Sequence, residues 1–308
     1  MRRTVVKPVH RSVVVPRAEL NQAVQRARGA LASPQFDARP ALQALWLLLI
    51  EPVAAHLAGV RDLEVTPDAA LRYVPFAALH DGRRYLAERV VVTTRWAGTA
   101  MPNGGSARRA GSGVFALGRS AGDASHSALP GVLDELAVLR SRGAMVLADA
   151  DFTAQKLADG LARRPAIVHL ASHFTLDPAS EEGSYLLLGD DRRLSLAELS
   201  RLPWQGVHLA VLSACDSAVT LEGGPGRELI GFASNLQRAG VAHVLATLWR
   251  VADGETARWM SLFYGPGRAM PKASSVSSAQ RTWLHRFAGQ PQAHPHYWAG
   301  FTWLGGER

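Results

Sequence analysis

Residues 166–176 read AIVHLASHFTL, and this stretch decides the fold class. Its apolar run ends in a polar turn after Ala171, which is typical of a short strand buried on both faces. Similar runs cover residues 113–118, 144–149, 206–214 and 241–249, and segments with helical spacing cover residues 131–143, 153–164 and 226–240. Because buried strands that alternate with helices form a mostly parallel sheet covered on both sides, the sequence predicts an α/β fold.

The remaining segments predict a smaller N-terminal part and a boundary. Residues 1–34 are basic and are expected to form a peripheral arm, and the apolar segment 41–50 is expected to form a buried helix. The turn at Thr66-Pro67-Asp68 indicates a β-hairpin. The polar, glycine-rich segment 102–113 indicates a linker. We therefore expect a helix and β-hairpin subdomain over residues 35–105 and a larger α/β subdomain over residues 106–308.

The C-terminal end of the chain adds two expected elements. Residues 274–287 have helical spacing, and residues 297–304 alternate as expected for an outer strand of the sheet.

Composition narrows the function classes. The chain has 308 residues, of which 47% are hydrophobic and 19% charged, so a sizeable core is expected. The net charge is +8, but the basic residues are spread along the chain without a nucleic-acid motif, so no specific nucleic-acid partner is expected. The apolar segment 41–60 is interrupted by charge, and no secretory signal is visible, so no membrane partner is expected.

The single cysteine, Cys215, excludes an internal disulfide and a multi-cysteine zinc site. A lone thiol suits a reducing compartment, so a cytoplasmic location is expected. The chain lacks the G-K-[ST] ending of a P-loop, the G-x-G-x-x-G frame of a dinucleotide fold and the G-x-S-x-G motif of a serine hydrolase. We expect neither a metal nor an organic cofactor.

Two side chains that carry chemistry follow two of the buried runs. His173 lies just beyond the run at 166–172, and Cys215 follows the run at 206–214. Active sites of open α/β sheets gather at the carboxyl ends of the strands, so the two side chains share one rim if these strands are neighbours. An imidazole beside a thiol generates the reactive thiolate. His169 lies inside its run and is expected to be a core residue, and spacing alone leaves structural roles open for His173 and Cys215 as well.

Several longer segments resemble one family. VHLASHF, VLSACDSA, GRELIGFASNLQRAGVAHVLATLWRVAD and HPHYWAGFTWLG, together with LRYVPFAALHDGRRYLAERV and ALPGVLDELAVL upstream, resemble the CHAT family. These domains are caspase-like cysteine peptidases related to separase, within the caspase–gingipain–separase group. The resemblance extends from about residue 40 to the C-terminus and implies a caspase-like three-layer sandwich.

The resemblance also implies roles for individual residues. His173 matches the general base and Cys215 the nucleophile, and the backbone N–H groups of Phe174 and Cys215 match the oxyanion hole. Asp253 matches an aspartate that holds a basic P1 side chain, while the simpler alternative is that it caps the helix that follows it. Asp216 is a candidate for lining the cleft.

The implied function is a cysteine endopeptidase that hydrolyses peptide bonds in a protein or peptide substrate. CHAT domains often act under helical-repeat regulatory partners in bacterial signalling or defence systems. The alternatives are a non-proteolytic CHAT interaction or scaffold module and a dormant protease that awaits activation.

Overall fold

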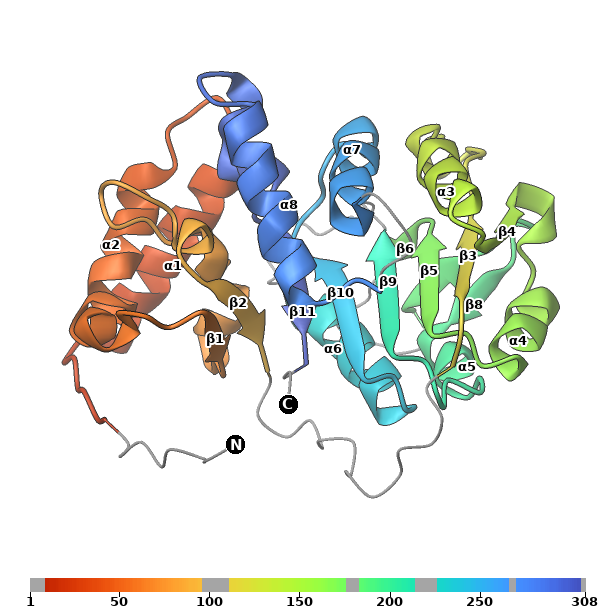
Figure 1. Ribbon diagram of the computed structural model, residues 1–308, viewed down its shortest axis with the longest axis horizontal. Coiled ribbons are helices and arrows are strands. Elements are labelled where there is room, and N and C mark those ends of the chain that lie inside the picture. The colour runs from red at the N-terminus through yellow and green to blue at the C-terminus, as the bar shows by residue number, and fades with distance from the viewer. Residues whose placement is uncertain (1–8, 96–110, 176–182, 214–225, 266–269, 306–308) are drawn as a thin grey trace.

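The computed structural model describes residues 9–95, 111–175, 183–213, 226–265 and 270–305, with the backbone alone for residues 226–231 (Figure 1). Within these residues a central sheet has eight strands in the order β1-β2-β11-β10-β9-β5-β3-β4. In that order the strands are Asp62–Val65, Val91–Thr94, Phe301–Leu304, His243–Thr247, Leu209–Ser213, Ile167–Ala171, Val114–Gly118 and Met145–Ala148. Neighbouring strands are parallel except for the β10–β11 pair, which is antiparallel.

Helices cover both faces of the sheet, as the continuous apolar runs predict (Figure 1). One face packs against α1, α2, α3, α7 and α8, which are Arg17–Ala32, Arg39–Leu49, Gly131–Ser141, Asp253–Tyr264 and Ala273–Arg286. The other packs against α4, α5 and α6, which are Ala154–Ala162, Leu196–Ser200 and Gly226–Arg238. Residues of β5 alternate between these layers, with Ile167 in the first and Val168 in the second. The sheet is therefore the middle layer of three.

A small second sheet follows β5 along the chain. It consists of β6, β7 and β8, which are Phe174–Thr175, Tyr185–Leu187 and Arg193–Ser195, and all its pairs are antiparallel. Leu186 and Leu194 bury this sheet in the same layer as α4, α5 and α6. Because β6 begins at Phe174, the second sheet holds the chain directly after His173.

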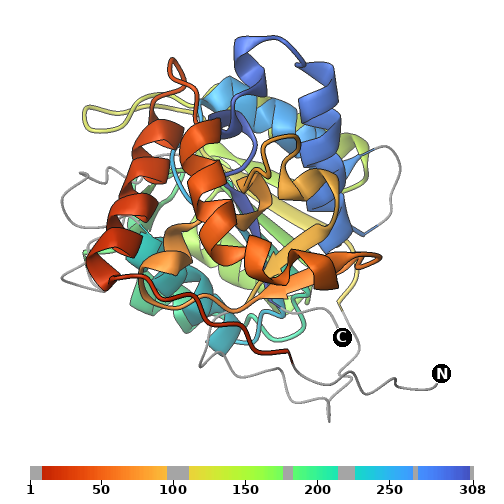
Figure 2. The ribbon, with the colours of Figure 1, turned by 90° about the vertical axis from the view of Figure 1, so that its left-hand side faces the viewer.

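The N-terminal region contains a core helix that the expected arm did not include. Helix α1 buries Ala23, Val24, Ala27 and Leu31, whose spacing places them on one helical face. Helices α1 and α2 lie together at the β1 end of the sheet, which faces the viewer in Figure 2. The chain before residue 35 therefore contributes to the core.

The predicted β-hairpin is wrong. Strand β1 pairs in parallel with β2, and its partner residues run from Asp62↔Val91 to Val65↔Thr94. After β1, the Asp68 side chain accepts a hydrogen bond from Ala69 N at 2.7 Å and begins the 3-10 helix Ala69–Tyr73. The Thr-Pro-Asp turn thus starts a helical turn, because the aspartate caps it instead of reversing a strand.

The expectation of an outer strand at the C-terminus is also wrong. Strand β11 lies between β10 and β2, and its ends pair with both, Thr247↔Phe301 on one side and Leu304↔Thr94 on the other. Strand β11 is internal because the N-terminal strands β1 and β2 extend the sheet beyond it. The chain on both sides of the predicted 105/106 boundary therefore contributes to one sheet, while the boundary itself lies outside the described residues.

Among the helices described, none taken singly has the length and apolar character needed to cross a membrane. One bent pair, α2 with the 3-10 helix Glu51–Leu57, passes that test jointly, with an angle of 75° between its halves.

Candidate active site

Strands β5 and β9 are direct neighbours, so the condition on which the site depends is met. They are parallel, and Ala171 is paired with Ser213 at their carboxyl ends. His173 lies two residues beyond Ala171, at this rim of the sheet. Cys215 and Asp216 lie outside the described residues.

Strand β7 holds the chain at Ser172 and His173 through two hydrogen bonds. The Ser172 hydroxyl donates to the carbonyl oxygen of Leu187 at 2.5 Å, and Leu187 N–H donates to the carbonyl oxygen of His173 at 2.9 Å. The His173 side chain is 0% exposed. Its position is therefore set by the sheet and does not depend on a free loop conformation.

One ring nitrogen of His173 has an assigned role. Nε2 lies 2.8 Å from the carbonyl oxygen of Ser127. A carbonyl oxygen can only accept, so Nε2 carries the proton in the neutral ring and Nδ1 carries the lone pair. The tautomer with a basic Nδ1 is thus selected by the Ser127 backbone.

Ser127 belongs to the segment 119–130, which joins β3 to α3 and is tied to β5. Arg119 N–H donates to the carbonyl oxygen of Ala171 at 2.9 Å. The Arg119 side chain is buried and donates to Asp123 at 3.1 Å and to Asp191 at 2.6 Å. The segment therefore begins at the same strand end that carries His173.

Asp123 organises the next part of this segment. Its carboxylate accepts from Ser125 N at 2.7 Å and from His126 N at 2.8 Å. The Ser125 N–H bond, with further bonds from His126 and Arg119, holds the pKa of Asp123 well below its usual range. Asp123 is therefore ionised over the whole ordinary pH range and fixes the turn just before Ser127.

His126 lies beside His173 and was not a candidate from the sequence. Its ring centroid is 5.0 Å from that of His173, Nδ1 is 3.0 Å from Asp123 Oδ1, and Nε2 is 3.4 Å from the Tyr185 hydroxyl. The local signal is the pattern Asp-x-x-His directly after a buried strand, at Asp123 and His126. That pattern is common in turns, so only the contact with His173 gives it significance.

Asp253 occupies the first position of α7 and contacts the first residue of α3. Its Oδ2 accepts a hydrogen bond from Gly131 N, so it caps α3, while α7 has Ala252 at its N-cap. Burial raises the pKa of Asp253, and the charge of His173 acts in the opposite direction. Asp253 is thus within electrostatic range of His173, and the helix that it caps is not the one predicted.

Gly131 is required by this contact. A Cβ at position 131 would lie 2.8 Å from both Cγ and Oδ2 of Asp253. Only a residue without a side chain allows the carboxylate to approach the end of α3 so closely.

Phe174 follows His173 and points away from solvent. It is buried in β6, and its ring meets the ring of Phe232 of α6 edge to face, with centroids 4.7 Å apart. Its backbone N–H is one of the two donors that the sequence analysis assigned to the oxyanion hole. Over the described ranges, no three His, Cys, Asp or Glu side chains gather closely enough to hold a metal ion.

The CHAT domain family matches the sequence over residues 39–306. The chain belongs to the CHAT domain family. No curated protein matches it. Among solved structures, it is similar to RgpB of Porphyromonas gingivalis in a complex of its pro- and mature domains, with 11% identity, a TM-score of 0.53, and coverage of 95% of this chain and 77% of that one.

A second similar structure is the Arg specific cysteine proteinase gingipain R (RGPB), with 13% identity, a TM-score of 0.52, and coverage of 94% of this chain and 74% of that one. At these identities the likeness shows the fold alone. The caspase-like three-layer α/β fold predicted from the sequence is confirmed, and the chain shares its fold with these gingipain structures.

Proposed function

We propose that this CHAT protein is a cysteine endopeptidase in which His173 activates Cys215. The observation that carries the proposal is the His173–Ser127 contact at 2.8 Å, at the end of a strand whose neighbour leads to the only cysteine. That contact prepares Nδ1 as a base, and a thiol nucleophile needs a base of this kind.

The reaction follows from these assignments. Nδ1 of His173 takes the thiol proton of Cys215, and the sulfur attacks the carbonyl carbon of the scissile peptide bond. The N–H groups of Phe174 and Cys215 donate to the developing oxyanion. The C–N bond then breaks as His173 returns the proton to the leaving amine, which leaves a thioester on Cys215. His173 takes a proton from water as the water oxygen attacks the thioester carbonyl. The C–S bond then breaks, the peptide leaves with a new carboxyl group, and His173 returns the proton to the sulfur of Cys215.

The segment 119–130 positions the base in this proposal. The Ser127 carbonyl orients the His173 ring, and the ionised Asp123 holds the turn that presents Ser127. His126 covers one side of His173, with its own ring bound to Asp123. Rigid support of this kind keeps the base within hydrogen-bond reach of the thiol.

Asp253 is the proposed partner of a basic P1 side chain. Asp253 is half-buried and lies near His173, at the first position of α7, and its side chain accepts a hydrogen bond from the first residue of α3. An ionised carboxylate at this position attracts arginine or lysine. Asp216 is proposed to line the same cleft. A helical-repeat protein in a bacterial signalling or defence system is the proposed regulatory partner, and the cytoplasm is the proposed location.

One observation favours the dormant alternative for the isolated chain. The His173 side chain is 0% exposed, so the surrounding residues close the approach of a substrate to it. A protease awaiting activation would cut only after a partner opens that approach.

Cleavage of a peptide library with mass-spectrometric readout tests the proposal. Wild type is expected to cleave after basic residues, and Cys215→Ala and His173→Ala are expected to cleave nothing. His285→Ala, a substitution of an exposed histidine on α8, is the matched control and should behave as wild type. Equal cleavage by wild type and Cys215→Ala would refute the proposed chemistry, and cleavage without P1 preference would refute the role of Asp253.

A further inference from the structure

The central sheet ends in two edge strands, β1 on one side and β4 on the other. Strand β1 exposes two charged residues, Asp62 and Glu64, and Glu64 is paired with Arg95. Charged side chains of this kind keep an edge strand from pairing with another chain. Strand β4 has the sequence MVLA, residues 145–148, and carries no charge. The β4 edge therefore lacks the protection that the β1 edge has.

Strand β4 is open along its outer side. None of its four residues is buried, and Met145 is 40% exposed, whereas the neighbouring strand β3 is buried from Phe115 to Gly118. Strand β4 pairs with β3 on one side only. Within the described ranges, no other segment forms a backbone hydrogen bond with residues 145–148. The outward N–H and C=O groups of such an edge are a template for a further strand.

The two ends of β4 carry opposite charge. At its start, Nη1 of the exposed Arg163 lies 4.0 Å from Sδ of Met145, and Arg163 has no ion pair among the residues described. At its end, the turn after β4 supplies two carboxylates, Asp149 and Asp151, against one cation, Lys156, which is paired with Asp151. The start of β4 is therefore basic and its end is acidic.

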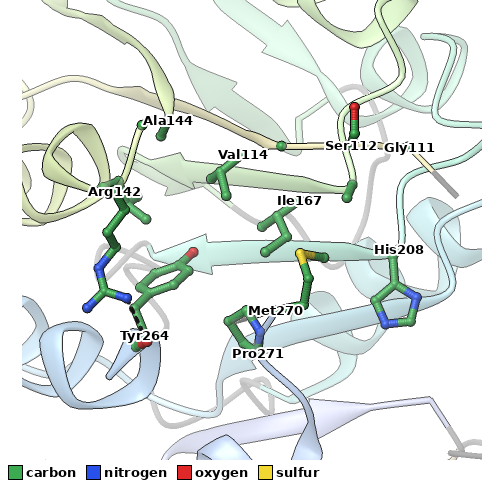
Figure 3. A pocket seen from close by; sticks show the side chains of 14 residues that line it. Gly111, Ser112, Val114, Arg142, Ala144, Ile167, His208, Tyr264, Met270 and Pro271 are labelled. Atoms are coloured by element: carbon green, nitrogen blue, oxygen red, sulfur yellow. Dashed lines mark hydrogen bonds between the residues drawn. The ribbon is translucent and has the colours of Figure 1, made fainter. Parts of the chain in front are cut away.

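Helix α3 covers this part of the sheet and has α7 on its inner side (Figure 1). Glu135 Oε2 lies 3.0 Å from Nε2 of His169 in β5. Arg142 Nη1 donates to the carbonyl oxygen of Tyr264 at 2.7 Å, beside a cavity of about 660 Å³ (Figure 3). His169 is 0% exposed and is the core residue predicted from the sequence. Glu135 and Arg142 thus mark the flank of α3 that faces the inside of the protein.

The opposite flank of α3 faces outward at the β4 end of the sheet. Leu133 and Arg140 are seven residues apart, as Glu135 and Arg142 are, and the two pairs are offset by two residues, or about 200° around the helix. Leu133 is 48% exposed, and Arg140 is exposed in the last turn of α3, just before β4. An apolar side chain and a second arginine therefore border the open edge.

We propose that the β4 edge binds a second copy of this chain, with the two β4 strands antiparallel across a two-fold axis normal to the sheet. Antiparallel pairing sets the basic start of each β4 beside the acidic end of the other, so that Arg163 of one copy meets Asp151 of the other. A parallel arrangement would place like charges together. The two central sheets then join into one continuous sheet.

The symmetry limits the register of this pairing. Val146 and Ala148 pack toward the layer of α3, and Leu147 packs toward the layer of α4. The two-fold axis keeps each residue on its own face of the sheet, so the pairing is centred on a residue, either Val146 or Leu147. The interface does not depend on the proposed peptidase chemistry.

The oligomeric state of the full chain is the first test, measured by sedimentation velocity at concentrations from about 1 to 200 µM. At about 0.15 M salt, the long-range repulsion between two chains of net charge +8 is largely screened. We expect a dimer whose fraction rises with concentration. A chain that stays monomeric over this range would overturn the proposal.

Hydrogen exchange locates the interface. When the concentration is raised from the monomeric to the dimeric range, exchange of the amides in residues 145–148 should slow by about 5-fold or more, because the outward amides become paired. Exchange in residues 62–65 of β1 should not change. A dimer that protects β1 and leaves β4 unprotected would show that the other edge is the interface.

Charge reversal tests the antiparallel arrangement. Arg163→Glu and Asp151→Lys should each raise the dissociation constant of the dimer about 10-fold, because each charge pair occurs twice across the axis. The double variant restores opposite charges and should regain the wild-type affinity. The matched controls are Arg61→Glu and Asp62→Lys at the β1 edge, which should leave the dissociation constant unchanged. All four side chains are exposed, so these variants should fold as wild type does.

Two outcomes of this experiment would contradict the proposal. One is a double variant that dimerises no better than either single variant, since the two charges then do not meet across the axis. The other is a loss of affinity in the β1 variants that equals the loss in the β4 variants.

Discussion

Replacement of Gly131 by alanine tests how the two helices meet at the candidate active site. On propensity alone, alanine should stabilise a helix by up to about 1 kcal/mol relative to glycine. The structure predicts the opposite sign. A Cβ at this position would lie 2.8 Å from Cγ and Oδ2 of Asp253, whereas ordinary van der Waals contact begins at 3.4 Å.

The magnitude follows from the contacts that must change. Displacing the carboxylate loses its bond from Gly131 N–H, and a hydrogen bond to a charged group contributes about 1.5–3 kcal/mol. Overpacking in a close contact costs about 1–3 kcal/mol. After the helix-propensity gain is subtracted, we expect Gly131→Ala to lower the free energy of unfolding by about 3 kcal/mol, measured by urea denaturation.

The matched control is Gly254→Ala, one residue after Asp253. Gly254 is exposed in α7, and a Cβ there would meet nothing within 4 Å. This variant should be as stable as wild type or more stable by up to about 1 kcal/mol. If Gly131→Ala is also neutral or stabilising, the close approach of Asp253 to α3 is not as described, and the reasoning fails.

Three further predictions concern single side chains. Because burial raises the pKa of Asp253 in the folded protein, the wild type loses stability as pH rises from the ordinary carboxyl pKa of 3.8 through the raised value. Over that pH window, Asp253→Asn should therefore gain stability relative to wild type in urea titrations. A parallel pH dependence of the two proteins would contradict this. Asp123→Asn should weaken the turn that holds Ser127 and slow alkylation of Cys215 by iodoacetamide about 10-fold, with the far-ultraviolet circular dichroism unchanged. An unaltered alkylation rate would show that Asp123 does not position His173. Thr153→Ala removes the cap of α4, in which the Thr153 hydroxyl accepts from Lys156 N, and should lower the free energy of unfolding by about 1 kcal/mol; a loss below a few tenths would show that water replaces the cap.

The parallel core of the sheet could be predicted because its signals are local. Strands β5 and β9 lie within the runs 166–172 and 206–214, and every residue of the two strands is buried. That β5 and β9 are neighbours did not follow from these runs, because β6, β7, β8 and α5 lie between the two strands in the chain. The Thr153 cap, by contrast, was predictable, since its partner is three residues away.

The misplaced elements depend on partners that are distant in the sequence. Nothing within residues 297–304 indicates that Thr94 pairs with Leu304, yet that pairing makes β11 internal. Likewise, the local pattern at Asp68 predicts a hairpin, because nothing near it indicates that the partner of β1 is the distant strand β2. Register between distant segments is set by tertiary packing, which a local pattern does not contain.

In the candidate site, too, a residue could be predicted where its signal is local and could not where it depends on a contact between distant segments. His173 could be found because it follows a buried strand. His126 and Asp123 could not, because their importance lies in a contact between two segments 47 residues apart, from His126 to His173. The cap of α3 by Asp253 is likewise a contact between two helices, and the residue spacing within either helix does not predict it.

The most direct test of the central claim is covalent labelling of Cys215 by a peptidyl acyloxymethyl ketone with arginine at P1, followed by intact mass. Wild type and His285→Ala should gain one label per chain, while His173→Ala and Cys215→Ala should gain none over the same time. Labelling of His173→Ala at the wild-type rate, or labelling that survives in Cys215→Ala, would contradict the assignment of His173 as the base that activates Cys215.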